Sequence, residues 1–325
     1  MHSLLKSLNT FNDHQDYVVA IIISTKGSTY RKTGAMMLVD QNLNYWGLLS
    51  GGCLEGDIIL HCKNTFLTKK DQTLEYNMRD EVDMLWGMGL GCDGEITVLL
   101  KYLPANEKHY AFFIALMQLN SGTDQILTID KNANHLMNFG SKFCSTSQED
   151  ENVVSFKMKA PHHLLICGGA PDVAPVTAIA NQIGWKTTVI DHREDYAKND
   201  NFPLAAHVKV IRRSMWKDFD LSIFGSAIIM SHQFERDQSY LSRLIKSNIG
   251  YIGLLGPTNR RNKLLEQCET VFSKQEGRVF GPIGLDIGAD SPETIALAII
   301  SEIQAVTNDK QNHNKINFCY QDPNR

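Results

Sequence analysis

Two cysteines lie inside glycine-rich turns and are the residues of this sequence best suited to chemistry. Cys53 lies in the run 50–57 (SGGCLEGD), and Cys92 lies in the run 87–94 (GMGLGCDG). Glycine loses more conformational entropy on folding than any other residue, so a dense run of glycines indicates a backbone that turns tightly or approaches a ligand closely. Thiolates are soft ligands. The sequence therefore predicts a ligand site in which Cys53 and Cys92 bind a metal.

Residues close to the two cysteines are further candidates for binding a cofactor: Gly51, Gly52, Glu55, Gly91, Asp93 and Arg31. Arg31 lies in the turn 27–32 (GSTYRK), whose two positive charges suit an anionic group. Glu55 falls in the first turn of a helix predicted over 54–67, where the helix dipole favours acids whatever their role. Each cysteine could equally be a small apolar residue that fits beside glycine. The similarity of the two runs favours a site.

Composition and charge exclude several classes of protein. The chain has 325 residues, of which 43% are hydrophobic and 21% charged, and this is long enough for two domains with cores. A net charge of −4 and a pI of about 6.3 give no global attraction for nucleic acid. No apolar run reaches the roughly 18 residues of a membrane-spanning helix, and the first residues lack the pattern of an export signal. We therefore expect no nucleic-acid partner and no membrane.

Cysteine usage indicates the redox environment. The seven cysteines form an odd set without a CxxC pair, which argues against a disulfide framework and a zinc knuckle. Free thiols in a reducing environment are the simpler interpretation. We therefore expect a cytoplasmic protein.

The first half of the chain is typical of a mixed α/β domain over 1–103. Apolar runs predict strands at 17–24, 35–39, 45–49 and 96–102, and the helix 54–67 follows the first glycine run. Residues 104–160 form a poorly specified connecting region, with a possible helix at 110–119, possible strands at 125–129 and 153–158, and an exposed loop at 141–152. We expect a domain boundary near 159–161.

The second half alternates strand and helix patterns, which indicates a parallel sheet covered on both faces. Strands are predicted at 163–167, 187–190, 208–211, 227–230 and 251–255. Ser291 and Pro292 are typical of the first residues of a helix. The sequence thus predicts a Rossmann-like domain over 161–307, followed by a polar tail over 308–325.

The predicted strand 163–167 leads into a turn that resembles a dinucleotide fingerprint. Gly168 begins this turn, and Asp191 ends the next strand at the interval expected of a ribose-binding acid. Ala170 and Val173 replace the second and third glycines of the fingerprint. Pro171 removes an amide donor, and Asp172, a predicted helix N-cap, adds negative charge.

NAD binding is therefore left open by the sequence. If a nucleotide binds, Gly168 and Asp191 contact it, and Asp191 favours NAD over NADP, although Arg193 weakens that preference. Arg260 and Arg261, after the predicted strand 251–255, could bind a phosphate or a carboxylate, or could lie on a solvated helix face.

Several blocks resemble the xanthine dehydrogenase accessory factors, the XdhC/CoxI family: GSTYRKTGAMMLV (27–39), SGGCLEGD (50–57), WGMGLGCDG (86–94), GGAPDVAPVTAIANQIGWKTTVIDHR (168–193), YIGLLGPTNRR (251–261) and GPIGLDIGADSPETIALAIISEI (281–303). The likeness spans most of the chain outside about 104–160. It implies a protein that binds the molybdenum cofactor, protects its sulfurated form and delivers it to a molybdenum hydroxylase such as xanthine dehydrogenase.

The resemblance implies a maturation factor, and a homodimer, rather than an enzyme with its own turnover. The cofactor is a phosphorylated pterin dithiolene, so Cys53, Cys92, Arg31 and Lys32 are groups of a suitable kind. Two alternatives remain open from the residues. One is an NAD-dependent oxidoreductase acting on a small substrate, for which no acid–base pair is evident. The other is a thiol-based sulfur carrier.

Overall fold

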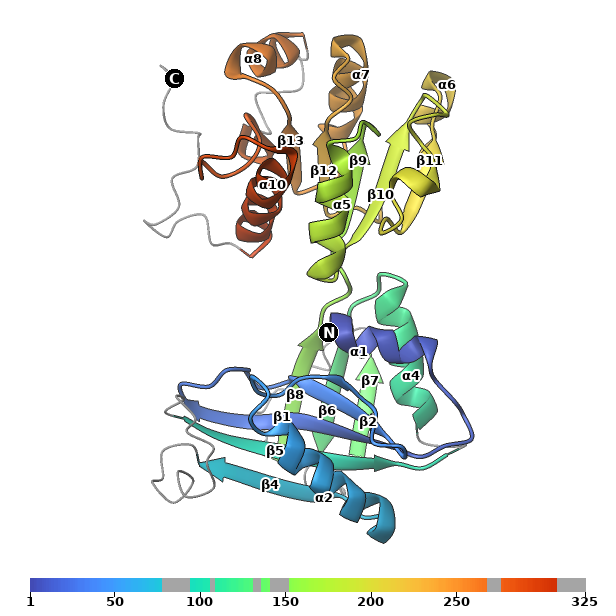
Figure 1. Cartoon of the computed structure of the whole chain (residues 1–325), viewed down its shortest axis with the longest axis vertical. Coiled ribbons are helices and arrows are strands. Elements are labelled where there is room, and N and C mark those ends of the chain that lie inside the picture. Colours follow the sequence, from blue (N-terminus) through green and yellow to red (C-terminus); the bar gives the residue numbers. More distant parts are fainter. Residues whose placement is uncertain (78–93, 106–108, 131–135, 141–151, 268–275, 309–325) are drawn as a thin grey trace. The chain divides into compact units, whose positions relative to one another are not determined.

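The computed structural model describes residues 1–77, 94–105, 109–130, 136–140, 152–267 and 276–308. The chain divides into two compact units, Met1–Pro161 and His162–Arg325, each with its own cores (Figure 1). The segment 104–160 belongs to the first unit. Gly91, Cys92 and Asp93, like the predicted tail from 309 onward and most of the predicted loop 141–152, lie outside the described residues.

The first unit contains a five-stranded antiparallel sheet in the order β3-β2-β1-β5-β4. Its strands are β1 (Tyr17–Gly27), β2 (Met36–Asp40), β3 (Tyr45–Gly47), β4 (Gln72–Asn77) and β5 (Gly94–Leu103). A second, three-stranded sheet consists of β6 (Gln125–Asp130), β7 (Leu136–Gly140) and β8 (Val153–Met158). The helical elements are α1 (His2–Leu5), η1 (Lys6–Asn9), α2 (Glu55–Thr68) and α4 (His109–Asn120). The predicted mixed α/β domain is confirmed, with β4 and β7 added.

Strand β1 is buried on both faces, which explains its unbroken apolar run. One face, with Val19 and Ile21, belongs to a core shared with α4 and the three-stranded sheet. The other face, with Ala20 and Ile22, belongs to a core shared with α2, which contributes Ile58. Successive side chains of a strand point to opposite faces, so each layer receives alternate residues. The sheet therefore packs α2 on one face and α4 with the three-stranded sheet on the other.

The second unit is a doubly wound parallel sheet in the order β11-β10-β9-β12-β13-β14. Its strands are β9 (His163–Cys167), β10 (Lys186–Asp191), β11 (His207–Val210), β12 (Ser226–Ile229), β13 (Tyr251–Leu254) and β14 (Val279–Phe280). Its helical elements are α5 (Val173–Gln182), η2 (Asn199–Asn201), α6 (Arg213–Trp216), α7 (Phe234–Leu244), α8 (Thr258–Glu266), η3 (Glu276–Arg278) and α10 (Pro292–Thr307). The predicted Rossmann-like sheet is confirmed, with β14 added at its edge.

Helices cover both faces of this sheet. One core joins Leu164 and Ile166 of β9 to α5 and α10, and the other joins Leu165 and Cys167 to α7 and α8. Ser291 caps α10 through a reciprocal capping box with Thr294, as its sequence predicts. The strand order reverses between β9 and β12. In folds of this class, ligands bind beyond the carboxyl ends of the strands at such a point.

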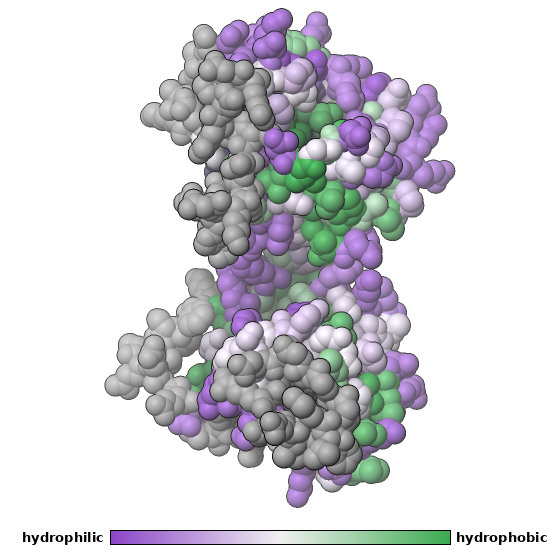
Figure 2. Space-filling model, turned by 60° about the vertical axis from the view of Figure 1, so that its left-hand side comes forward, coloured by the Kyte–Doolittle hydropathy of each residue, from purple (hydrophilic) through white to green (hydrophobic). Residues whose placement is uncertain are grey.

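On the face shown in Figure 2, the described residues are largely hydrophilic, with apolar side chains gathered in patches. Exposed large hydrophobic residues of the second unit are Ile183, Tyr196, Leu204, Met215, Ile223, Ile287 and Leu297. Within the described part of the chain, no helix has the length and apolar character needed to cross a membrane.

Candidate functional site

The glycine-rich loop before α2 is held in place by the carboxylate of Glu55, which is 4% exposed. Glu55 Oε1 accepts hydrogen bonds from the amides of Leu49 at 2.9 Å and Ser50 at 2.8 Å, and Oε2 accepts one from the Ser50 hydroxyl. Ser50 Oγ in turn accepts hydrogen bonds from the amides of Gly52 at 3.2 Å and Leu54 at 3.0 Å. The loop is therefore fixed by side chains of its own segment.

Burial alone would raise the pKa of Glu55, but the hydrogen bonds from Ser50 and Leu49 outweigh it, so the pKa is lowered. The carboxylate stays ionised and directs both of its oxygens into the loop. Glu55 was predicted to contact a cofactor, yet both of its oxygens are bonded to the loop itself. Its geometry suits a role in which it positions Gly51, Gly52 and Cys53.

The loop presents an accessible thiol. Of the three cysteines that the structure describes, Cys53 is exposed, whereas Cys62 and Cys167 are buried. Burial raises the pKa of Cys62 to about 12 and raises that of Cys167 well above its ordinary value, so neither is suited to bind a ligand as a thiolate. Gly52 has a φ of +109°, and among the described residues nothing lies within 4 Å of a Cβ built on it, so a ligand could approach the backbone beside Cys53.

The turn 27–32 lies against this loop. A Cβ built on Gly51 would stand 3.8 Å from Cε2 of Tyr30, whose side chain is 64% exposed. Gly27 pairs with Gly94 at the start of β5, where a Cβ would lie 2.4 Å from the Ser28 carbonyl oxygen. The structure thus brings together two segments that the sequence predicted to form one site.

Arg31 follows Tyr30 in this turn and is half-buried. The ion pairs described near it join Lys26 to Glu95 and Lys101 to Asp71, and no described ion pair involves Arg31. No cluster of three or more His, Cys, Asp or Glu side chains within the described ranges could hold a metal ion. A metal bound through Cys53 would need ligands from elsewhere, and Cys92 falls outside the described residues.

In the second unit, Asp191 is engaged by its own domain rather than directed to a ligand. Its side chain is 1% exposed. The carboxylate accepts hydrogen bonds from the Arg193 amide at 2.9 Å, from Arg193 Nε at 3.0 Å and Nη2 at 2.8 Å, and from the Gly169 amide at 2.9 Å. Burial would raise its pKa, but these bonds outweigh burial and lower it. An ionised carboxylate has about four acceptor sites, so little capacity remains for a ribose hydroxyl.

Gly168 and Gly169, the two glycines after β9, allow neighbouring loops to pack closely against this turn. Gly168 has a φ of +130°, and a Cβ there would lie 2.3 Å from the Met230 carbonyl oxygen. A Cβ on Gly169 would lie 2.7 Å from the Tyr196 carbonyl oxygen. The neighbouring protein backbone therefore explains both glycines without a bound pyrophosphate.

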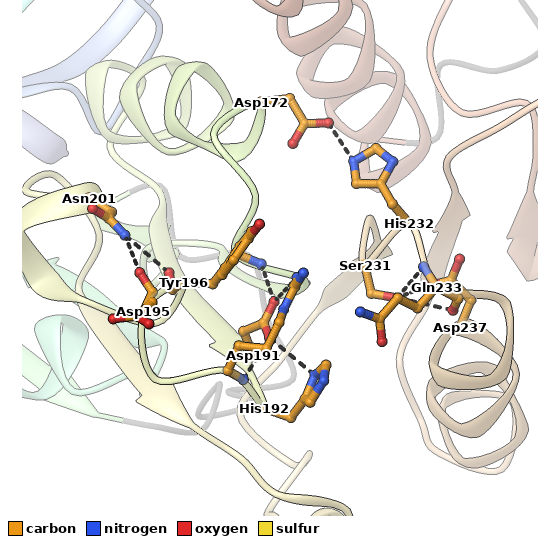
Figure 3. A network of polar contacts seen from close by, with 12 residues as sticks. Asp172, Asp191, His192, Asp195, Tyr196, Asn201, Ser231, His232, Gln233 and Asp237 are labelled. Carbon is orange, nitrogen blue, oxygen red and sulfur yellow. Dashed lines mark hydrogen bonds and ion pairs between the residues drawn. The ribbon is translucent and has the colours of Figure 1, made fainter.

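Asp172 occupies the N-cap position of α5, but its side chain does not cap the helix, in contrast to the usual role of an acid there. Pro175, at the third helical position, has no amide to donate, and the Ala174 amide bonds to Pro171. The carboxylate instead accepts a hydrogen bond of 2.9 Å from His232 Nε2 (Figure 3). His232 follows β12 in a left-handed conformation, with a φ of +59°.

A buried network supports the turn that carries His232. Ser231 donates a hydrogen bond to Asp237, which is 2% exposed, and accepts one from the Gln233 amide at 3.2 Å. Arg260 Nη2 bonds to Asp237 at 2.7 Å. Arg260 was a candidate for binding phosphate, and the structure gives it this internal partner instead. The sequence offered one signal for the arrangement, a Ser-His pair followed by an acid one helical turn into α7.

A small cavity of about 290 Å³ lies beside the loop after β9. It is lined by Gly169, Pro171, Ala174, Asp195, Tyr196, Asn201 and Phe202. Its walls come from the start of α5 and from the segment that follows β10. The sequence did not predict this cavity, because it depends on how two segments pack.

Comparison with known proteins agrees with this architecture. Residues 11–77 match the XdhC and CoxI family, and residues 164–303 match the XdhC Rossmann domain. A protein of Bacillus subtilis described as a probable subunit of xanthine dehydrogenase is 30% identical over 93% of this chain and 96% of the relative. The chain belongs to the XdhC and CoxI family. The predicted resemblance is confirmed.

Two further proteins are similar to this member of the XdhC and CoxI family over most of its length. The molybdenum cofactor insertion chaperone PaoD from Escherichia coli is 22% identical over 89% of this chain and 83% of PaoD. The crystal structure of a xanthine dehydrogenase from Bacillus halodurans matches with a TM-score of 0.82 at 27% identity, covering 95% of this chain and 96% of that one. The predicted fold class is thereby confirmed.

Proposed function

We propose that this protein is an accessory factor that binds the molybdenum cofactor, protects its sulfurated form and passes it to a molybdenum hydroxylase such as xanthine dehydrogenase. The observation that carries the proposal is the exposed Cys53 on a loop fixed by Ser50 and Glu55. Membership of the XdhC and CoxI family and the likeness to the chaperone PaoD support it.

The residues of the loop are chemically suited to such a group. When bound, the cofactor supplies a molybdenum centre and its sulfur to the client enzyme. Cys53 offers a soft sulfur ligand, and the open space at Gly52 allows close approach to the backbone. Arg31 and Lys32 offer positive charge to the phosphate of the pterin. Glu55 acts by holding the loop.

The contacts of Asp191 weigh against the alternative of an NAD-dependent oxidoreductase, because its carboxylate is already bonded to Arg193 and Gly169. A thiol-based sulfur carrier remains a second candidate, because an exposed thiol such as Cys53 could also carry a persulfide. Delivery requires contact with a client enzyme, and the homodimer stays a prediction that light scattering can test.

Anaerobic purification from a molybdenum-replete host, followed by metal and pterin analysis, tests the proposal. We expect molybdenum and pterin to copurify with the full chain, to fall in Cys53→Ala, and to persist in the matched Cys62→Ala variant, whose thiol is buried. Absence of both from the wild-type chain would contradict the proposal. A persulfide on Cys53 without molybdenum would favour the sulfur carrier.

A further inference from the structure

The cavity in the second unit has the features of a site for one small ring system. Its volume of about 290 Å³ lies just below the roughly 300–1,000 Å³ found for small-molecule sites, which suits one ring system better than a whole dinucleotide. The residues that line it include the apolar Pro171 and Ala174 and the aromatic Tyr196 and Phe202. Such walls suit a planar, aromatic ligand.

Tyr196 is held in place by Arg193 and Asp191, two residues that were considered from the sequence for binding a nucleotide. The guanidinium of Arg193 stacks at 3.6 Å over the Tyr196 ring. Arg193 is itself fixed by the buried carboxylate of Asp191 through bonds of 2.8 and 3.0 Å. Asp191 therefore positions Arg193, and Arg193 positions Tyr196, so the acid at the end of β10 builds the cavity wall instead of binding ribose.

The residues of the loop after β9 disfavour a phosphate group in or beside the cavity. The Gly169 amide is bonded to Asp191, and Pro171 has no amide to offer. The Asp172 carboxylate adds negative charge on the same loop. A ligand that carries phosphate would thus meet few donors and a like charge, whereas an uncharged ring would meet neither obstacle.

Two polar residues of the lining, Asn201 and Asp195, offer hydrogen-bond acceptors. Asn201 Nδ2 donates to the carbonyl oxygens of Asp195 at 3.0 Å and Tyr196 at 3.4 Å, which leaves its amide oxygen to accept (Figure 3). Asp195 adds a carboxylate that is 87% exposed and pairs with Lys198. Such acceptors favour a ligand that presents donors, as an aromatic amine does.

We infer that the second unit binds an uncharged, planar nitrogen heterocycle carrying an amino group, in the cavity between Tyr196 and Ala174. This chemistry is shared by an aminopurine nucleoside and by a free pterin. The site belongs to residues other than those of the Cys53 loop, and the inference holds whether or not that loop binds a cofactor.

Isothermal titration calorimetry on the full chain tests the inference with adenosine and pterin as probes, and with AMP and NAD as phosphorylated comparisons. We expect saturable binding of adenosine, pterin or both, with AMP and NAD weaker than adenosine. Which ring binds identifies the source of the ligand. No saturable binding of either ring at millimolar concentration, or tighter binding of NAD than of both, would overturn the inference.

Substitutions in the cavity lining test whether the ligand binds in the cavity. Ala174→Leu fills it and Tyr196→Ala removes its aromatic wall, and each should weaken binding by about tenfold or more. Ala178→Leu makes the same change one helical turn later, at a position outside the cavity lining, and should leave binding unchanged. Circular dichroism confirms that each variant is folded. Equal binding by Ala174→Leu and wild type would place the ligand elsewhere and refute the assignment.

Discussion

The imidazole of His232 donates a hydrogen bond of 2.9 Å to the carboxylate of Asp172, joining the loop after β12 to the loop after β9. The two residues are 60 positions apart in sequence. They meet because the strand order reverses between β9 and β12, which places the two loops side by side. The pair is partly exposed, with side chains 52% and 27% accessible, so its own contribution to stability is small, about 1 kcal/mol or less.

The left-handed backbone at position 232 predicts an unusual order of stability for substitutions. A residue with a Cβ is strained at a φ of +59°, whereas glycine is not. We expect His232→Gly to be more stable than His232→Ala by about 1 kcal/mol, although both lose the bond to Asp172. Urea denaturation measures this difference. An alanine variant as stable as the glycine variant would show that the strain is absent.

Position 168 predicts a larger effect, because the glycine there faces protein backbone. A Cβ would lie 2.3 Å from the Met230 carbonyl oxygen, and φ is +130°. We expect Gly168→Ala to destabilise the second unit by about 3 kcal/mol or more. Gly52→Ala is the matched control, since its φ is also positive at +109° but no atom of the described residues lies within 4 Å of the added Cβ. In Gly52→Ala, backbone strain alone should lower the free energy of unfolding by about 1–2 kcal/mol.

Thermal unfolding of both variants provides the measurement. Equal losses would mean that the backbone conformation, and not the contact with Met230, limits position 168. The two variants therefore separate the two reasons for which a chain retains glycine.

The main elements of the fold could be predicted from sequence because their signals are local and strong. The runs that became β1 and β9 are mostly apolar, since helices or sheets cover both of their faces. Strand β4 (QTLEYN) was missed because it lies at the edge of its sheet, and its alternating pattern is short and rich in polar residues. Weak periodicity of this kind does not distinguish an edge strand from a loop.

The roles of the polar residues were harder to predict, because they depend on partners distant in sequence. Asp191 stands at the interval expected of a ribose-binding acid, yet Arg193 and Gly169 occupy its carboxylate. His232 carried no local signal for its partner Asp172. Cys53 was selected as a ligand residue from the glycines of its own segment; the structure shows that it is exposed, and its role as a ligand stays a prediction.

Two histidines at the amino end of the parallel sheet predict a loss of stability in acid. Burial lowers the pKa of His162 to about 4, and burial together with His207 and Lys186 lowers the pKa of His163 to about 4. Their ordinary value is about 6.5, so both are neutral in the folded protein at neutral pH. The contribution of the two neutral histidines to the free energy of unfolding is fully present above pH 6.5. It is lost as pH falls from 6.5 toward 4, because in this range the histidines of the unfolded chain take up protons more readily than those of the folded protein.

We expect this loss to amount to about 1–3 kcal/mol for each histidine. Urea unfolding at a series of pH values measures it. His163→Gln keeps a polar partner for Thr188 Oγ1, which lies 3.0 Å from His163 Nε2. The variant should show a shallower decline than wild type between pH 6.5 and 4. Parallel curves for the two proteins would exclude His163 as a source of the acid sensitivity.

The contacts of Glu55 predict that its charge fixes the Cys53 loop. In the wild type, the amides of Leu49 and Ser50 and the Ser50 hydroxyl all donate to the Glu55 carboxylate. In Glu55→Gln, one carboxylate oxygen is replaced by an NH₂ group, which is itself a donor and must face one of these donors. We expect a loss of about 1–3 kcal/mol and a changed rate of alkylation at Cys53, measured by mass spectrometry of the peptide that contains it.

Asp57→Asn is the matched control, because it removes the same charge from the first turn of α2 while Asp57 contacts Tyr76 and His61 instead of the loop. Both substitutions alter the field at the helix terminus alike, so a change in alkylation confined to Glu55→Gln must come from the loop hydrogen bonds. If both variants change the rate equally, the helix field governs the thiol, and Glu55 does not position it.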